Sequence, residues 1–305
     1  WDVTGQWKLL GEKSIRMVIW DTPEYPRRLY GIPDAPLILY EKGLPYRNEG
    51  ISVAVIGARN CSSYGSLAAK ELGRYLAEAS ITVVSGMALG VDGISQWATL
   101  EAGGYSVGLL GSGVEHCYPK ENYRLYQRLL KEGTVVSEYP IQAEPRAGNF
   151  PRRNRLISGL ADIVAVVEAR EKSGTLITVD MALEQGRDVY AMPGRITDVL
   201  SRGCNQLIRQ GAGILMSPRE FVEELLQLPG KGDTQLKKGE EPAFSDRERQ
   251  LFELLEPFPI SFELLFQKAK EQGIRGTQGE LLEELLQLCI RKKAYQKDGY
   301  FFREL

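Results

Sequence analysis

The feature that most constrains the fold is a series of short β-branched runs separated by helical patterns. The runs are ISVAVIG (51–57), ITVVSG (81–86), YSVGLLG (105–111), TVVSE (134–138), DIVAVVEA (162–169) and DVYAMPG (188–194). Each is almost continuously apolar rather than alternating, which indicates that both faces of the sheet are covered. Strands that alternate with helices form parallel βαβ units. The pattern therefore predicts an α/β protein whose parallel sheet is covered by helices.

The rest of the chain suggests smaller parts around this domain. A length of 305 residues suits about two domains. Residues 229–243 are polar and glycine-rich, which is typical of a linker. Residues 244–305 show three amphipathic helical patterns and a hairpin pattern around Asp298-Gly299, which predict a winged-helix domain. The main domain is expected at 15–228, and 1–14 is a candidate remnant of an N-terminal helical domain.

Histidine and cysteine usage excludes several kinds of chemistry. His116 is the only histidine and lies in a turn-rich stretch, so no zinc site with two histidines and no catalytic role for His116 are expected. Cys61, Cys117, Cys204 and Cys289 lack metal-ligand or redox spacing, which favours a reducing cytoplasm and no bound metal. The apolar runs are too short to cross a membrane, which takes roughly 20 residues.

Three strand-to-helix turns resemble anion-binding loops. Ligands of parallel sheets gather where the strands end, and the turns 57–65, 85–93 and 171–178 each follow a predicted strand. Small residues there leave backbone N–H groups free to contact a phosphate. The candidate phosphate-binding residues are Gly57, Ser62, Ser63, Ser85, Gly86, Ser173, Gly174 and Thr175. Neither a P-loop nor a complete G-x-G-x-x-G motif occurs, so no nucleotide cofactor is expected.

A cluster of arginines suggests a polyanionic partner. Four of them, Arg146, Arg152, Arg153 and Arg155, lie near one predicted helix start. The nearest acids along the chain are Glu138, Glu144 and Asp162, which are too few to neutralise the cluster locally. Arginine binds phosphate oxygens in a fork, while an aromatic ring stacks on an unpaired base, so the arginines with Phe150 predict single-stranded DNA binding.

Two details of this stretch stay open. Tyr118 and Tyr139 are weaker candidates to assist Phe150 in stacking. The competing interpretation is a solvated basic face with Phe150 in the core and Asn154 capping the helix.

Several motifs resemble the bacterial DNA-processing protein A (DprA/Smf) family. They are YPRRLYGIPDAPLILYEKG (25–43), GARNCSSYG, SGMALGVDG, the GSGVEHCYP loop, FPRRNRLISGL, EAREKSGTLIT and AMPGRITDVLSRGCNQLIRQGA, in the family's order over about residues 15–228. The resemblance implies an extended Rossmann-like domain, single-stranded DNA binding and dimerisation. It also implies loading of the RecA recombinase during natural transformation, without enzymatic turnover.

The resemblance also assigns DNA contacts. Arg59 matches the arginine of the family's V-G-x-R element, and the F-P-x-R-N-R element falls on residues 150–155 with Arg152 at its variable position. A basic residue often precedes that element, and Arg146 is the nearest here. The predicted DNA-binding residues are Arg59, Arg146, Phe150, Arg152, Arg153, Asn154 and Arg155. One departure is that Ser95 and Gln96 stand where the family commonly has alanine and histidine.

Two other functions remain alternatives. The sheet with its Ser-Gly-Thr turn is also similar to that of phosphoribohydrolase-type nucleotide-processing enzymes, for which Asp92, Glu168 and Glu184 would be the candidate acids. That family's P-G-G-x-G-T-x-x-E signature is absent. The other alternative is a scaffold that dimerises and recruits partners, with DNA contact secondary.

The charge of the predicted winged-helix domain argues against a DNA-reading role. Residues 244–305 hold ten Lys or Arg and eleven Asp or Glu, a net charge of -1. The helix that would enter the major groove carries Glu280, Glu283 and Glu284, which phosphate would repel. Basic residues on the wing, at 291–293, could still touch a DNA backbone. A protein-contact or regulatory role is favoured.

Overall fold

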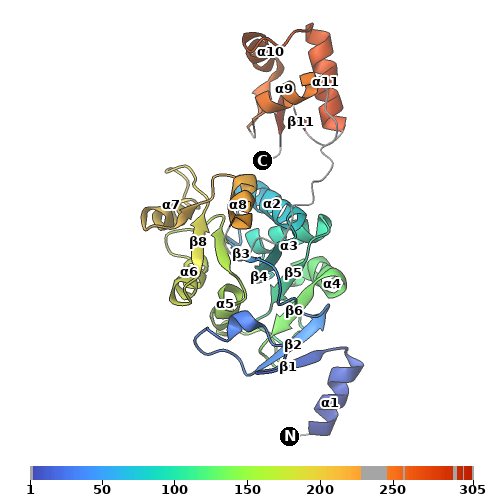
Figure 1. Cartoon of the computed structure of the whole chain (residues 1–305), viewed down its shortest axis with the longest axis vertical. Helices are drawn as coiled ribbons and strands as arrows, with labels where there is room; N and C mark the ends of the chain where they lie inside the picture. The colour runs from blue at the N-terminus through green and yellow to red at the C-terminus, as the bar shows by residue number, and fades with distance from the viewer. Residues whose placement is uncertain (1–2, 228–245, 257, 291–293, 298, 304–305) are drawn as a thin grey trace. The chain divides into compact units, whose positions relative to one another are not determined.

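The structure is a computed structural model that describes residues 3–227, 246–256, 258–290, 294–297 and 299–303. The chain divides into two compact units, residues 1–237 and 238–305 (Figure 1). Their boundary lies between 228 and 245, outside the described residues, as does the whole predicted linker 229–243. The predicted domain limits therefore stay predictions.

Unit 1 is built on a nine-stranded sheet in the order β1-β2-β6-β5-β4-β3-β7-β8-β9. The strands are β1 (Arg16–Ile19), β2 (Ile38–Gly43), β3 (Ser52–Ile56), β4 (Thr82–Ser85), β5 (Ser106–Leu109), β6 (Thr134–Ser137), β7 (Ile163–Val166), β8 (Asp188–Ala191) and β9 (Gly213–Ile214). All six predicted runs form strands, β3 to β8, and these pair in parallel. The predicted α/β fold is confirmed.

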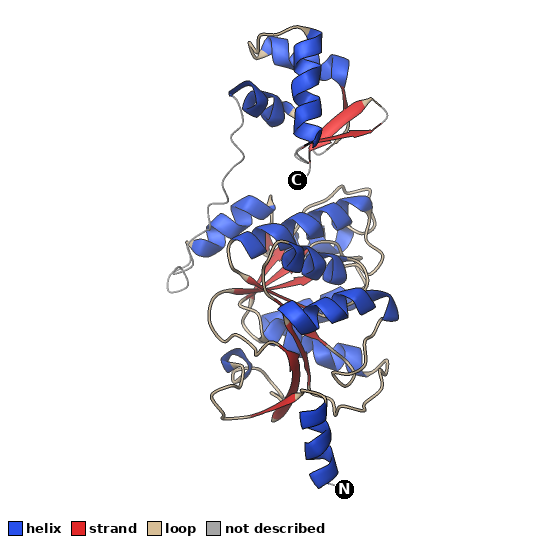
Figure 2. Ribbon diagram, turned by 90° about the vertical axis from the view of Figure 1, so that its right-hand side faces the viewer, coloured by secondary structure: helices blue, strands red, loops and turns tan. Residues whose placement is uncertain are grey.

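Helices cover both faces of this sheet (Figure 2). One face packs against η1 (Arg27–Leu29), α5 (Asn149–Gly159), α6 (Gly174–Glu184) and α7 (Arg202–Arg209), and the other against α2 (Ser63–Glu78), α3 (Val91–Glu101), α4 (Tyr123–Glu132) and α8 (Pro218–Leu226). Alternate residues of β3 enter the two cores, with Val53 and Val55 in one and Ala54 and Ile56 in the other. This double burial explains the continuous apolar runs.

Two further elements complete the unit. The helix α1 (Val3–Glu12) contacts β1, and its Leu10 joins the core beneath α3 and α4. The short helix η2 (Lys120–Asn122) leads into α4. The strands β1 and β2 pair antiparallel with each other, and β2 pairs antiparallel with β6. The sequence patterns did not predict this hairpin, nor the two-residue strand β9.

The strand order contains one topological switch. From β3 the chain moves outward through β4, β5 and β6, then returns to form β7 on the other side of β3. The turns that leave β3 and β7 therefore lead to helices on opposite faces, α2 and α6. In open α/β sheets such a switch leaves a crevice at the carboxyl ends of the strands. We call the edge where β3 to β8 end the carboxyl edge.

Unit 2 has its own core. It contains α9 (Asp246–Leu254), α10 (Phe262–Glu271), α11 (Gln278–Ile290) and a sheet in the order β10 (Ile260–Ser261), β12 (Tyr300–Arg303), β11 (Ala294–Lys297). Leu251, Leu265, Leu285 and Phe301 are buried together. Residues 291–293 and 298 lie outside the described residues, so the predicted wing contacts Arg291, Lys292 and Lys293 and the turn residue Asp298 are not described. The winged-helix assignment stays a prediction.

Candidate nucleic-acid interface

Arg153, predicted to face DNA, lies inside unit 1. It is 5% exposed, and its Nη1 donates to the carbonyl oxygen of Gly86 at 2.8 Å and to that of Leu109. These carbonyls belong to the turn after β4 and the end of β5. Burial lowers the pKa of Arg153 to about 10, the nearby Asp92 charge acts against this, and Arg59 adds to the lowering. The guanidinium thus joins α5 to the central strands.

Asp92 supplies the counter-charge. Its side chain is buried and accepts a hydrogen bond from the Gly86 N–H at 3.1 Å. Burial raises the pKa of Asp92, while Arg153 and hydrogen bonds from backbone N–H groups oppose the rise. The sequence-based prediction considered only acids close along the chain to the arginines. It therefore missed Asp92, which the β4 turn brings under α5.

Arg155 is also engaged within the protein. Its Nη2 lies 2.5 Å from Oε2 of Glu138, and both side chains are largely buried. Asp162, another predicted neighbour, pairs instead with Arg28 at 2.9 Å. The nearby acids were predicted to be too few to neutralise all four guanidiniums, and the structure adds that Arg153 and Arg155 do have internal partners. We call these two the inner arginines.

Three other arginines remain on the surface. Arg59, Arg146 and Arg152 are exposed, and no carboxylate lies within ion-pair distance of them among the described residues. Arg59 acts electrostatically on Arg153, and Arg152 on Tyr139, so both lie close to the start of α5. We call these three the outer arginines. They are the predicted DNA contacts whose charge stays available at the carboxyl edge.

An aromatic pair lies at the start of α5. The rings of Phe150 and Tyr118 stack with centroids 5.1 Å apart and an interplanar angle of 28°. A Cβ at Gly111 would come within 2.9 Å of the Phe150 ring, so glycine permits this placement. Phe150 is half-buried, whereas Tyr118 is 42% exposed. Asn154 lies within α5, which begins at Asn149, and is not its cap.

The first predicted phosphate loop is occupied by an internal carboxylate. Ser62 caps α2 by accepting from the Gly65 N–H at 3.1 Å. Glu168, which follows β7, accepts from the Ser62 N–H at 2.8 Å and from its Oγ at 2.5 Å. The positive end of α2 is thereby compensated at the topological switch. Ser63 is exposed.

The second loop is likewise bonded internally. Ser85 is buried and donates to the Val55 carbonyl oxygen at 2.7 Å. The N–H groups of Gly57 and Gly86 donate hydrogen bonds to the Asp92 carboxylate. Gly90 has φ 74°, and a Cβ there would lie 2.2 Å from the Ala58 carbonyl oxygen. Only glycine fits this close approach of the first two loops. The hydrogen-bonding groups of both loops are therefore used within the protein, at the carboxyl edge.

The third loop differs from the other two. Ser173 precedes α6 in extended conformation, and its Oγ has no hydrogen-bond partner in the part of the chain that the structure describes. Gly174 is exposed, and Thr175 is half-buried. Lys172 is exposed directly before this helix start, and it was not among the predicted contacts. The sequence signal that could have identified Lys172 as a contact is a lysine directly before a Ser-Gly-Thr turn.

Gln96, the departure from the family pattern, has a structural role. It is fully buried and accepts from the Met87 N–H at 3.1 Å. Its Nε2 donates to the Ser106 Oγ and to the Val107 carbonyl oxygen, each at 3.1 Å. Gln96 therefore fixes α3 to β5 and to the turn after β4. Ser95 is buried beside it and donates to the Asp92 carbonyl oxygen at 3.0 Å.

The acids of the enzymatic alternative do not converge. Asp92 and Glu168 accept internal hydrogen bonds at the carboxyl edge, whereas Glu184 is exposed at the opposite end of α6. Among the described residues, no three His, Cys, Asp or Glu side chains are grouped to hold a metal ion. The described helices include none with the length and apolar character needed to cross a membrane.

These features define a Rossmann-like α/β protein. At its topological switch Glu168 accepts the hydrogen bonds of the first loop, and its carboxyl edge carries exposed arginines and a stacked aromatic pair. Residues 16–226 match the sequence profile of the family DNA recombination-mediator protein A. The chain therefore belongs to this family, as the motifs predicted.

Curated relatives agree with this assignment. The chain is 38% identical to the DNA processing protein DprA of Bacillus subtilis over 215 residues, which cover 70% of this chain and 72% of the relative. It is 41% identical to the protein Smf of Escherichia coli over 206 residues, which cover 67% of this chain and 55% of the relative. The match thus spans little more than half of the Escherichia coli protein.

Solved structures show the same fold. The X-ray structure of DNA processing protein A from Streptococcus pneumoniae aligns with a TM-score of 0.67 at 37% identity, over 71% of this chain and 77% of that protein. DNA processing protein A from Helicobacter pylori, whose structure is described for its single-stranded DNA binding mode, aligns with a TM-score of 0.64 at 29% identity. That alignment covers 69% of this chain and 96% of that protein.

Proposed function

We propose that this protein is a non-catalytic, sequence-tolerant single-stranded DNA binder that acts as a recombination mediator and loads RecA during DNA uptake. The observation that carries the proposal is the combination of the exposed outer arginines, which have no ion-pair partner in the described part of the chain, with the stacked Tyr118–Phe150 pair. Guanidinium groups bind phosphate oxygens and aromatic faces stack on any base, which together favour an unpaired strand.

The start of α6 is the second part of the proposed interface. Its exposed Gly174 N-terminus and the ammonium group of Lys172 attract a phosphate, and no side chain among the described residues caps this helix start. The inner arginines hold α5 in place and do not themselves contact the strand. The relative from Helicobacter pylori, described as binding single-stranded DNA, supports this function for the shared fold.

Dimerisation is proposed at the β9 edge of the sheet. Ile214 in this terminal strand and Met216 just after it are 49% and 70% exposed. Exposed apolar residues beside an open strand edge favour pairing with a second copy. A Met216→Lys variant is expected to lower the dimer fraction in sedimentation equilibrium. An unchanged dimer would move the interface elsewhere.

Unit 2 is proposed to contact protein rather than DNA. Arg247 lies 2.8 Å from Glu284 and 3.8 Å from Glu280 of α11, so a basic residue of this unit serves its own acids. Removing residues 244–305 is expected to leave affinity for DNA nearly unchanged. We further propose a cytoplasmic location and RecA as the protein partner. A pull-down of RecA with and without residues 244–305 tests the second proposal.

The central test measures binding to a fluorescent oligothymidine at several salt concentrations. Arg59→Glu and Arg152→Glu are expected to weaken binding by about tenfold or more, because each reverses a charge beside a phosphate. The slope of log affinity against log salt should flatten by about 0.7 for each phosphate that the variant no longer neutralises. Arg209→Glu is the control, since Arg209 is exposed at the far end of α7. Unchanged binding in both Arg59→Glu and Arg152→Glu would refute the interface.

A further inference from the structure

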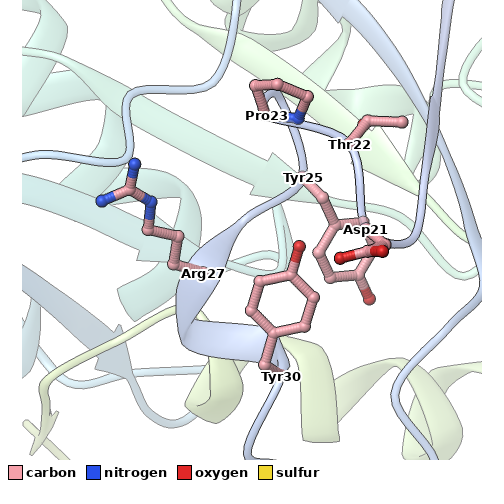
Figure 3. A pocket seen from close by; sticks show the side chains of 6 residues that line it. All are labelled: Asp21, Thr22, Pro23, Tyr25, Arg27 and Tyr30. Atoms are coloured by element: carbon pink, nitrogen blue, oxygen red, sulfur yellow. The ribbon is translucent and has the colours of Figure 1, made fainter.

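A pocket unrelated to the predicted contacts lies beside the β1–β2 hairpin. Its volume is about 450 Å³, and it is lined by Asp21, Thr22, Pro23, Tyr25, Arg27 and Tyr30 (Figure 3). The residues come from the segment between β1 and β2, which includes η1, and those from Tyr25 onward belong to the motif 25–43. No part of the proposed interface uses them.

The topology places this pocket along the carboxyl edge. The last residue of β6, Ser137, pairs with Tyr40, while Ile19 pairs with Ile38 further out. Because β2 runs antiparallel to β6, residues 19–21 lie beyond the carboxyl end of β6. Adjacent strands are about 4.8 Å apart, so β1 is roughly 15 Å from the β5 exit beneath Phe150.

The segment then turns toward α5. The helix η1 packs against α5, and the Tyr25 side chain lies within electrostatic reach of Arg155 and Glu138. The inner pair Arg155–Glu138 thus lies between α5 and the pocket. A strand held by the outer arginines can continue along the same edge to reach the pocket.

One wall of the pocket is an ordered aromatic cluster. The Tyr25 and Tyr30 rings lie 5.1 Å apart, and Trp20 meets Tyr30 edge to face at 4.8 Å. The Tyr25 hydroxyl donates to the Pro36 carbonyl oxygen at 2.6 Å, which fixes its ring. Tyr30 is 40% exposed and therefore offers an aromatic surface to a ligand.

The two charged side chains of the pocket, Arg27 and Asp21, favour different parts of a ligand. Figure 3 shows Arg27 on one side and the Asp21 carboxylate beside the tyrosine rings on the other. Both side chains are exposed, and no hydrogen bond or ion pair engages the Asp21 carboxylate among the described residues. A carboxylate repels phosphate but accepts hydrogen bonds from the amino groups of bases. The ligand therefore places its base against Asp21 and Tyr30 and its phosphate toward Arg27.

We infer that this pocket is a nucleobase subsite, in which Tyr30 stacks on one base of the bound strand and Asp21 accepts a hydrogen bond from that base's exocyclic amino group. The inference deepens the proposed function and rests on it. Adenine, cytosine and guanine carry such an amino group, whereas thymine does not. The otherwise sequence-tolerant interface thereby acquires one discriminating position.

The test compares oligocytidine, oligothymidine and free deoxycytidine monophosphate by fluorescence anisotropy and competition. Tyr30→Ala is expected to weaken oligocytidine binding by about tenfold, and the control Tyr30→Phe, which keeps the ring, by less than about twofold. Asp21→Asn should weaken oligocytidine binding more than oligothymidine binding. This substitution suits the backbone, because Asp21 has φ 65° and asparagine tolerates that region.

Each outcome separates this inference from the proposed function. If Tyr30→Ala and Asp21→Asn bind all oligonucleotides like the unaltered protein while Arg152→Glu binds weakly, the subsite is refuted and the interface stands. If the unaltered protein binds no single strand, both are refuted. If the monophosphate competes only through Tyr30 and Asp21 but neither variant affects oligonucleotides, the pocket holds a free nucleotide and the strand subsite is refuted. Unfolding curves of Tyr30→Ala check its fold, and Asp21→Asn gives an independent reading.

Discussion

Helix α5 presents two faces that use the same residue type in opposite ways. Arg152 is exposed, while its neighbour Arg153 is 5% exposed and bonded to two backbone carbonyls. A helix has about 3.6 residues per turn, so adjacent side chains diverge by about 100°. The comparison teaches that a basic cluster in sequence is not yet a basic surface. Part of its charge is buried within the fold, and only the rest is exposed to a ligand.

The two faces also differ in energetic terms. A buried guanidinium loses hydration and is stabilised only by fixed partners, here the Gly86 and Leu109 carbonyls and the charge of Asp92. An exposed guanidinium keeps its hydration and adds little to stability. Mutations on the inner face should therefore change folding, and those on the outer face binding.

The largest expected effect is that of Arg153→Met. Removing the inner guanidinium takes the nearby positive charge from the buried Asp92 and one donor from each of two carbonyls. Buried polar groups left without partners cost about 1–3 kcal/mol each, so the free energy of unfolding should fall by about 3 kcal/mol or more in urea titrations. The double variant Arg153→Met, Asp92→Asn should recover part of the loss. A loss of unfolding free energy below about 1 kcal/mol would contradict the role of Arg153 in stabilising the fold.

The sequence predicted the fold better than it predicted this division. The strands β3 to β8 were predictable because both faces of each are buried, as with Val53 and Ala54. The hairpin β1–β2 was not, because one short edge strand leaves a weak pattern: Arg16 and Met17 are half-buried and Ile19 is exposed.

The positions of the candidate loops were predictable, but the contacts that their residues make were not. The loops at the carboxyl edge follow from strand order alone. That Glu168 fills the turn at Ser62, and that Asp92 lies beneath Arg153, depends on contacts between distant segments. Periodicity carries no information on such contacts. Lys172 before the third loop is visible in the sequence, but the absence of an internal partner for Ser173 among the described residues is not, for the same reason.

Gln96, in α3, tests whether the stability of the fold near the carboxyl edge depends on neutral hydrogen bonds as well as on buried charge. Gln96→Leu removes one acceptor and one donor group and leaves the Met87 N–H and Val107 carbonyl without their partner. Unsatisfied buried groups cost about 1–3 kcal/mol, so a loss of about 2 kcal/mol in unfolding free energy is expected. Gln96→His, the residue common in the family, serves as the matched variant. No loss in Gln96→Leu would contradict the bridging role.

Glu115, outside α5, belongs to a half-buried ion pair that lies between the buried and the exposed arginines in its exposure. Burial alone would raise its pKa, but hydrogen bonds from Lys42 and Lys13 outweigh this and lower the pKa of Glu115 below its ordinary value. The pairing therefore stabilises the fold above the unfolded-state pKa and loses this effect as the pH falls through the folded-state pKa. Glu115→Gln should be less stable by about 1 kcal/mol or less at pH 7. Thermal unfolding at acidic pH should show the two proteins converging, and a constant difference would contradict this origin.

The smallest expected change in stability belongs to Arg152→Ala on the outer face. This side chain is exposed and has no ion-pair partner among the described residues, so unfolding free energy should change by less than about 0.5 kcal/mol. The same variant should weaken oligothymidine binding, because the missing cation no longer holds a phosphate. Measured beside Arg153→Met, it gives the sharpest form of the comparison. We expect one arginine to affect folding and its neighbour to affect binding. If Arg152→Ala destabilised the protein or left binding intact, the division of α5 into two faces would not describe its function.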